Sequence, residues 1–167
     1  QDPTGGVLIH SHGGLFYIEK WGARAIPLQS GKNHPVFFDP DDFIKDREGN
    51  ILAIYDGIYR WHPNQKKFIK LPNRLQTERI LAMVQDHDDA QVWWLGTLTG
   101  LWCFDLRSGE MHLFDKICPP GQARGIGKIL DDKRGHLWLS APATLARFDK
   151  KSKEFTFFSS KTPAPHQ

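Results

Sequence analysis

A repeat with a period of 43 to 44 residues runs through the chain and constrains its fold more than any single motif. The clearest copy, segment 92–105, reads as two β-strands joined by a tight turn. The residue that opens the second strand of this hairpin recurs at Gly14, Gly57, Gly100 and Thr144. These positions are 43, 43 and 44 residues apart. A fixed period of this length indicates a repeat architecture.

The same spacing holds at independent positions, so the repeat does not depend on the glycines. The residue that closes the second strand of each hairpin is Glu19, His62, Asp105 or Asp149. A later apolar residue recurs as Leu28, Leu71, Phe114 and Phe158. Each copy is therefore one structural unit that extends to the end of its last strand.

Each unit is predicted to contain four short antiparallel strands, because short apolar and aromatic runs alternate with turn residues. The predicted strands are 7–10, 14–19, 25–28, 42–45, 51–55, 57–61, 67–71, 80–85, 92–97, 101–104, 110–114, 128–130, 136–140, 145–148 and 154–158. The first unit begins one strand late. A sustained apolar stripe with helical spacing is not found, so helix is predicted to be nearly absent.

Units of this kind are typical of all-β proteins built from β-propeller blades, in which neighbouring blades bury their faces together. We predict a partial propeller with blades at about 1–28, 36–71, 79–114 and 125–158, and a flexible tail at 159–167. A β-solenoid is the alternative, although solenoid coils are usually shorter than this period.

The composition of the chain argues against nucleic-acid binding and against insertion into a membrane. The chain has 22 basic and 19 acidic side chains and a formal net charge of +3, which argues against nucleic acid as a partner. The sequence has no run of about 18 apolar residues, so direct membrane insertion is not predicted. Two cysteines make no disulfide framework, and Cys103 is expected to be a small buried residue in a strand.

We predict no metal site, no cofactor and no catalytic residues. His10, His12 and His34 lack a carboxylate or thiol at ligand spacing. Segment 86–89 resembles part of a calcium loop but lacks the central Gly and the distal Glu, so we expect it to be a solvated turn.

Two units resemble the two-component regulator propeller repeat. Along the chain, the unit of that family begins with an apolar strand that ends in Asp, followed by a turn that contains Gly. The motif Leu-Trp-Ile-Gly-Thr comes next, and then Gly-Leu, an aromatic residue or Arg, and a final Asp. The third unit matches with Trp94-Leu95-Gly96-Thr97, Gly100-Leu101-Trp102 and Asp105. The fourth keeps Leu137-Trp138-Leu139 and Arg147-Phe148-Asp149 but has Ser140 and Thr144 where the family favours Gly.

The resemblance implies the ligand-sensing region of a bacterial membrane receptor, extracytoplasmic or periplasmic and joined to a histidine kinase or diguanylate cyclase. Whole propellers of that family have about seven blades, so the chain is expected to be a segment of a larger sensor, and the rest of that sensor is its expected partner. The segment itself is expected to be non-catalytic. Its ligand is expected to be an oligosaccharide or another small molecule. A propeller lyase of the virginiamycin type and a purely structural interaction module are the alternatives.

A ligand is expected at the blade face that carries the loops between second and third strands and the blade connectors, because convergent polar groups favour binding. These loops and connectors contain His12, Asp56, Thr97, Thr99, Arg79 and Arg124.

Basic residues gather at the opposite rim, in the turns between third and fourth strands. They are Lys66, Lys67, Arg107, Lys150, Lys151 and Lys153. We expect a solvated edge that deters strand pairing, with docking to acidic lipid or an acidic partner as the alternative.

Trp94 and Trp138 occupy equivalent positions and are both expected to be buried between blades. With fewer than four complete blades, the first and last units should each leave an apolar face bare. We therefore predict self-association, with two copies head to tail in a pseudo-ring of about eight blades.

Overall fold

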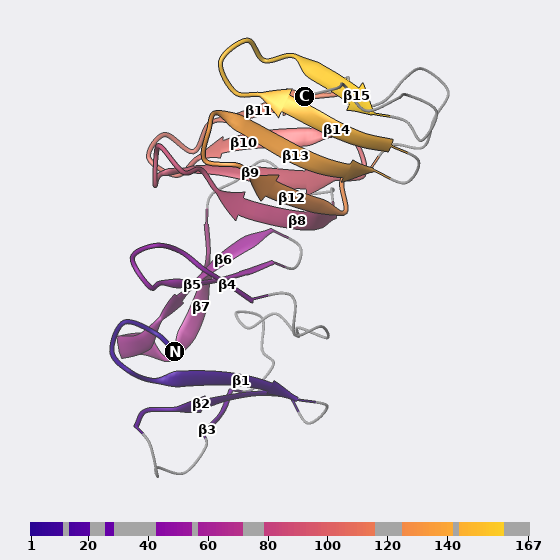
Figure 1. The fold of residues 1–167 in the computed structure, drawn as a ribbon. Coiled ribbons are helices and arrows are strands. Elements are labelled where there is room, and N and C mark those ends of the chain that lie inside the picture. Colours follow the sequence, from indigo (N-terminus) through magenta and orange to yellow (C-terminus); the bar gives the residue numbers. More distant parts are fainter. Residues whose placement is uncertain are drawn as a thin grey trace. The chain divides into compact units, whose positions relative to one another are not determined.

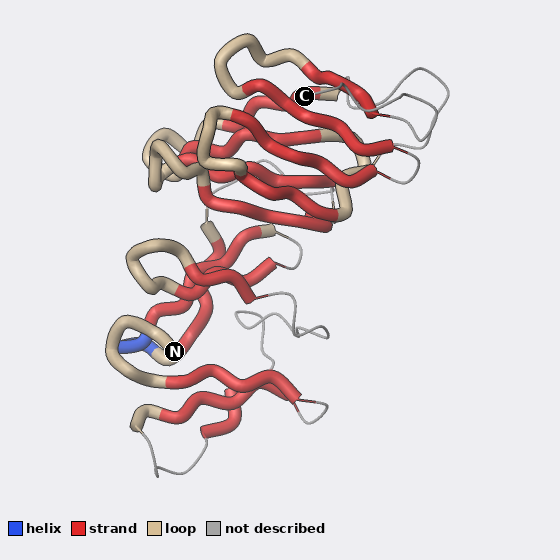
Figure 2. Tube along the Cα trace, viewed as in Figure 1, coloured by secondary structure: helices blue, strands red, loops and turns tan. Residues whose placement is uncertain are grey.

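The fold was analysed in a computed structural model, which describes residues 1–11, 14–20, 26–28, 43–54, 57–71, 79–115, 125–141 and 144–158. These residues form fifteen β-strands and one short 3-10 helix, η2 (Pro63–Gln65) (Figure 2). Within the described part of the chain, no helix is long and apolar enough to cross a membrane. The predicted all-β fold class is confirmed.

The strands form four antiparallel sheets, each a meander in which successive strands pair (Figure 1). The first sheet has three strands and the others have four. The first contains β1 (Val7–Ser11), β2 (Gly14–Ile18) and β3 (Ile26–Leu28). The second contains β4 (Phe43–Lys45), β5 (Ile51–Ile54), β6 (Ile58–His62) and β7 (Lys67–Lys70). The third contains β8 (Ile80–Gln85), β9 (Val92–Thr97), β10 (Leu101–Asp105) and β11 (Met111–Phe114). The fourth contains β12 (Lys128–Asp131), β13 (His136–Ala141), β14 (Thr144–Asp149) and β15 (Phe155–Phe158).

Each of the fifteen strands overlaps a predicted strand, and the described residues of the first sheet form three strands. The chain divides into two compact units, residues 1–77 and 78–167, with two sheets in each. The predicted tail at 159–167 lies outside the described residues.

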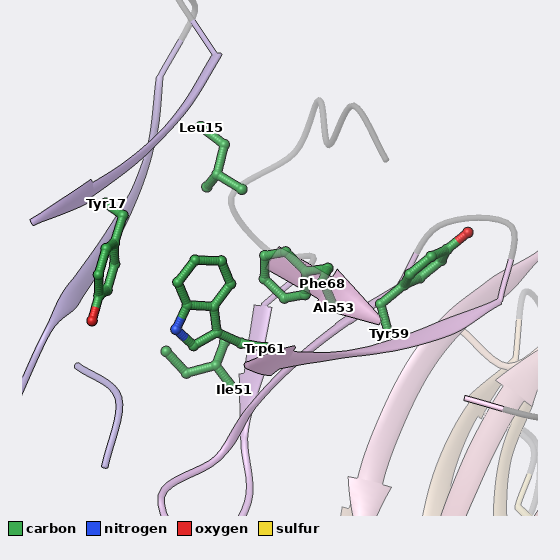
Figure 3. Close-up of a cluster of buried hydrophobic side chains, with 7 residues drawn as sticks. All are labelled: Leu15, Tyr17, Ile51, Ala53, Tyr59, Trp61 and Phe68. Atoms are coloured by element: carbon green, nitrogen blue, oxygen red, sulfur yellow. The ribbon is translucent and has the colours of Figure 1, made fainter. Parts of the chain in front are cut away.

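In the first unit, the core lies between the first and second sheets. Its buried side chains are Leu15, Tyr17, Ile51, Ala53, Tyr59, Trp61 and Phe68 (Figure 3). The Trp61 ring lies between the rings of Tyr17 and Phe68, with centroids 5.0 and 5.2 Å away. Tilted aromatic contacts of this kind stabilise a core beyond the area that they bury.

In the second unit, the third and fourth sheets stack face to face (Figure 1). The buried core contains Trp94 and Leu101 from the third sheet, Ile126 from the connection, and Leu137, Leu139, Ala146 and Phe148 from the fourth. Half-buried Cys103 packs against this core from β10. Burial raises the pKa of its thiol.

We call the side of a sheet that faces the preceding sheet its leading face, and the opposite side its trailing face. In the second unit, Trp94 and Leu101 lie on the trailing face of the third sheet, and Leu137, Leu139 and Phe148 lie on the leading face of the fourth. Side chains alternate along a strand, so Trp138 lies on the trailing face of the fourth sheet.

This placement corrects the expected burial of Trp138. Trp94 is buried as predicted, with 2% of its surface exposed, whereas Trp138 is only half-buried. The two residues are equivalent in the repeat, but the fourth sheet covers Trp94 and no later described strand follows the sheet that carries Trp138. Burial therefore depends on the neighbouring sheet as well as on the sequence register.

Candidate functional site

An aspartate at the start of a turn recurs in all four sheets. Asp46, Asp86 and Asp132 directly follow the first strand of their sheets, and Asp2 begins the turn that leads into β1. In each case Oδ1 accepts hydrogen bonds from backbone N–H groups of the same turn, as from Gly6 to Asp2 (2.9 Å) and from His136 to Asp132 (3.0 Å). The side chain thus caps its own turn, as Asp often does.

The second carboxylate oxygen of Asp2 links two sheets. Its Oδ2 accepts from the Tyr17 hydroxyl of its own sheet (3.0 Å) and from Trp61 Nε1 of the next sheet (2.9 Å). All three side chains are buried, so the two hydrogen bonds satisfy polar atoms that would otherwise be desolvated without partners.

The junction between the third and fourth sheets repeats this pattern with a charge. Oδ2 of Asp86 accepts from Trp94 Nε1 of its own sheet (2.6 Å) and from Lys150 Nζ of the next sheet (2.8 Å). Lys150 Nζ also donates to Asp131 Oδ2 at 2.6 Å. The Lys150 side chain is 10% exposed, and those of Asp86 and Asp131 are 7% and 6% exposed.

These contacts set the charge states of the cluster. Burial raises the pKa of Asp86, but hydrogen bonds from Lys150, Trp94 and two backbone N–H groups outweigh it and lower the pKa to about 2. Burial lowers the pKa of Lys150, while its bonds to Asp131 and Asp86 raise it by more, so the net shift is upward. The cluster is therefore an ion network that joins two sheets, in which the shifts favour the charged forms of Asp86 and Lys150.

Lys150 corrects the prediction of a fully solvated basic rim. The turns do carry the basic residues, but several are engaged in contacts: Lys66 pairs with Glu19 (2.5 Å), Arg107 pairs with Asp89 (2.7 Å), and Lys153 lies over the Trp94 ring. The turn at 86–89 is also less solvated than expected, since Asp86 is buried.

Sequence reasoning did not predict that these aspartates would bond to a neighbouring sheet. A signal was present, because Asp2, Asp46 and Asp132 each stand three residues before a repeated glycine. These glycines have positive φ angles of 86 to 93°, so they adopt the same left-handed turn. The repeat did not show which side chain of the following sheet donates to the aspartate, namely Trp61 to Asp2 and Lys150 to Asp86.

Three of the predicted ligand residues lie at one end of the third sheet. Arg79 is exposed and precedes Ile80, which pairs with Thr97. Thr97 and Thr99 have hydroxyl oxygens 3.1 Å apart. Thr97 is fully buried, and its hydroxyl also accepts from the backbone N–H groups of Thr99 (3.2 Å) and Gly100 (3.3 Å), so it holds the turn together. His12, Asp56 and Arg124 lie outside the described residues.

A groove that the sequence did not predict lies along β11 and β15. It has a volume of about 680 Å³, and its lining combines aromatic and apolar side chains with both charge signs. The lining residues are Leu113, Phe114, Asp115, Lys153, Glu154, Phe155 and Phe157. Its volume falls within the range of small-molecule pockets.

Solved structures with a similar fold include the extracellular domain of BT4673 from B. thetaiotaomicron. One structure, described as that of a hybrid two-component system, has a TM-score of 0.68 and 18% identity over 93% of this chain and 22% of its own. A second, described as that of a one-component system, has a TM-score of 0.68 and 15% identity over 98% of this chain and 22% of its own. The tricorn protease has a TM-score of 0.58 and 12% identity over 99% and 16%.

These likenesses support the predicted class of β-propeller blades in a partial propeller. The chain spans about a fifth of the length of the BT4673 chains. At these identities the likeness concerns the fold alone. No protein-family model matches the sequence, and no curated protein matches it.

Proposed function

We propose that the chain is a ligand-sensing β-propeller segment of an extracytoplasmic two-component sensor, and that it binds its ligand without changing it chemically. The observation that supports this most directly is the fold match to an extracellular two-component domain over 93% of the chain. The repeat motifs of the third and fourth units support the same proposal independently. Kinase or cyclase output would lie in other parts of the parent protein.

The chemistry of the described ionic groups suits binding better than catalysis. Asp86, Asp131 and Lys150 are buried and paired with one another. Asp2 and Asp132 cap turns, and hydrogen bonds that outweigh burial lower the pKa of each. A general acid or base needs a pKa near the working pH, and the pKa values of Asp2, Asp86, Asp132 and Lys150 are shifted away from it.

Two places are candidates for the ligand. The first is the end of the third sheet, where Arg79 and Thr99 are exposed beside the Thr97 turn. His12, Asp56 and Arg124 are proposed to contribute to it. The second is the groove along β11 and β15, favoured by its volume and by the stacked rings of Phe155 and Phe157 (centroids 6.1 Å apart), which could support a sugar ring.

A thermal-shift screen of the 167-residue chain against oligosaccharides, followed by calorimetric titration, tests the proposal. We expect a bound oligosaccharide that is recovered unchanged after prolonged incubation. Conversion of the ligand to an unsaturated product would support the lyase alternative instead. Failure of every oligosaccharide to bind, together with binding of another part of a sensor chain, would support the purely structural alternative.

Variants then locate the ligand. Arg79→Ala should weaken binding at least tenfold if the end of the third sheet is the site, because a charged hydrogen bond to the ligand contributes about 1.5 to 3 kcal/mol. Arg134→Ala, an exposed arginine in another turn, is the matched control and should have no effect. Loss of binding in Phe157→Ala with normal binding in Arg79→Ala would place the ligand in the groove.

A further inference from the structure

The last strand of each sheet lies at an edge, where one side of the strand pairs with no other described strand. These strands are β3, β7, β11 and β15. In the first unit both last strands carry residues that hinder the addition of another strand, Pro27 in β3 and Lys67 and Lys70 in β7. In the second unit, β11 and β15 contain no Pro, Lys, Arg, Asp or Glu. The edges of the second unit therefore lack this protection against strand pairing.

The backbone groups of Phe155 and Phe157 face the open edge of β15. Asp149 N–H donates to the Glu154 carbonyl at 3.0 Å, so these two residues form a hydrogen-bonded pair between β14 and β15. Hydrogen-bonded pairs alternate along an antiparallel ladder, which makes Thr156 the next β15 residue bonded to β14. The N–H and C=O groups of the two phenylalanines therefore point away from β14, where an added strand would meet them.

The groove along β11 and β15 lies beside this edge, and the side chains of Phe155 and Phe157 line it. Phe155 packs against Phe148 of the core, with ring centroids 4.8 Å apart, so both lining phenylalanines lie on the leading face of the fourth sheet. Phe157 is 36% exposed, and Leu113 across the groove is 38% exposed. A further sheet on the trailing face would lie on the other side of the fourth sheet and would leave this groove open.

Three charged side chains also line the groove: Asp115, Lys153 and Glu154. In the described part of the chain none of them has an ion-pair partner. Lys153 Nζ instead lies over the Phe114 ring, 5.9 Å from its centroid. With two carboxylates and one ammonium, the lining favours a basic group over an acidic one.

We propose that the open edge of β15 binds an extended peptide segment of a partner protein, which adds to the fourth sheet as a fifth strand. The peptide backbone pairs with Phe155 and Phe157, and every second side chain is apolar and enters the groove. A basic residue next to the apolar ones meets Asp115 and Glu154. The proposal does not depend on the sensory function, and it leaves the end of the third sheet for the small-molecule ligand.

The charge of the groove favours such a peptide over a second copy of the chain. Two copies that pair through their β15 edges make a symmetric contact, so each contributes the same surface. The second copy would bring another two carboxylates and one ammonium, which adds to the excess of negative charge. A peptide with a basic residue balances that excess.

Fluorescence polarisation of the 167-residue chain with labelled six-residue peptides tests the proposal. In each peptide Val, Leu or Phe alternates with Thr, and a Lys, Ser or Glu is placed first. We expect peptides with Lys first to bind, and those with Glu first to bind several-fold more weakly. The double variant Asp115→Asn with Glu154→Gln should remove this difference.

Methylation of alternate peptide nitrogens tests the strand pairing. Only one edge of an added strand faces β15, so methylation of one alternate set should abolish binding and methylation of the other set should spare it. Equal effects of the two sets would exclude strand addition and overturn the proposal.

Variants at Phe157 separate the side chain from the backbone. Phe157→Ala removes the ring and should weaken peptide binding about tenfold. Phe157→Pro also removes an N–H that faces the open edge, so it should weaken binding further while the β14–β15 ladder stays intact. Thr156→Ala, at an exposed residue on the other face of β15, is the matched control and should bind as the wild type does. Circular dichroism checks that each variant is folded.

Three other outcomes would overturn the proposal. The first is that no peptide binds, or that Phe157→Pro binds as well as the wild type. The second is a mass above 19.1 kDa in light scattering that Phe157→Pro abolishes, which would assign the edge to a second copy of the chain. The third is displacement of the peptide by an oligosaccharide, which would assign the groove to the small-molecule ligand.

Discussion

Lys150 is the residue whose contacts most clearly join two sheets. It reaches two carboxylates, at 2.8 Å on Asp86 and 2.6 Å on Asp131, from a side chain that is 10% exposed. A charge in such a place is tolerated only because it is paired, and removal of one partner leaves the other desolvated and unpaired.

Lys150→Met should therefore destabilise the chain by about 3 kcal/mol, since the breaking of a buried ion pair leaves two carboxylates without their counter-ion. Lys151→Met, at the exposed neighbouring lysine, should change stability by less than about 0.5 kcal/mol. Urea unfolding followed by tryptophan fluorescence measures both. Addition of Asp86→Asn to Lys150→Met should recover part of the loss, and equal effects of the two lysine variants would contradict the network.

Acid should weaken the same junction. The pKa of Asp86 is lowered from 3.8 to about 2 in the folded chain, so the folded state binds this proton less readily than the unfolded state. Its contribution, about 2 kcal/mol, is present above about pH 4 and is lost as the pH falls toward 2.

Urea unfolding across this pH range should show a shallower decline in Asp86→Asn than in the wild type. Asp88→Asn is the control, because that side chain is 71% exposed. An unchanged acid slope in Asp86→Asn would mean that the junction does not depend on the Asp86 charge.

Strand β9 depends on a close backbone approach. A Cβ atom at Gly96 would lie 2.5 Å from the carbonyl oxygen of Ile126, and Ile126 N–H donates to the Thr97 carbonyl at 3.0 Å. The glycine therefore allows the connection between the third and fourth sheets to pass directly against the strand.

Gly96→Ala should cost about 1 to 3 kcal/mol, because the added methyl group forces the connection away from β9 and strains the packing around it. Gly127→Ala is a matched control one residue beyond Ile126, where a Cβ would meet nothing within 4 Å. Thermal or urea unfolding compares the two. A Gly96→Ala chain as stable as Gly127→Ala would show that the connection adjusts freely.

The chain divides into two compact units, and each contains a cluster of buried side chains. Phe68 belongs to the cluster between the first and second sheets, and Phe148 belongs to the cluster between the third and fourth. In repeat architectures, stability is approximately a sum of unit stabilities and contacts between neighbours. Damage to one core should therefore be felt first within its own unit.

Phe68→Ala should increase amide hydrogen exchange in β1–β7 more than in β12–β15, because the lost packing lies in the first unit. Phe148→Ala should give the opposite pattern. Mass spectrometry of peptides from each unit measures the difference. A uniform increase in exchange across both units for either variant would contradict this prediction.

The sequence by itself determined the repeat, the fifteen described strands and the all-β class. It could do so because strand periodicity and turn residues are local properties of each 43- to 44-residue copy. It also placed Arg79, Thr97 and Thr99 at one end of one sheet. Their role as ligand residues stays a prediction, as does that of His12, Asp56 and Arg124.

Only the tertiary structure decided which equivalent residues are buried and which charges are paired. Trp94 and Trp138 share a position in the repeat, but a neighbouring sheet covers only the first in the described part of the chain. Lys150 and Lys151 are adjacent, yet only the side chain of Lys150 turns into the junction and meets Asp86 and Asp131. Burial and ion pairing depend on atoms supplied by a different sheet, and no local pattern of residue types contains that information.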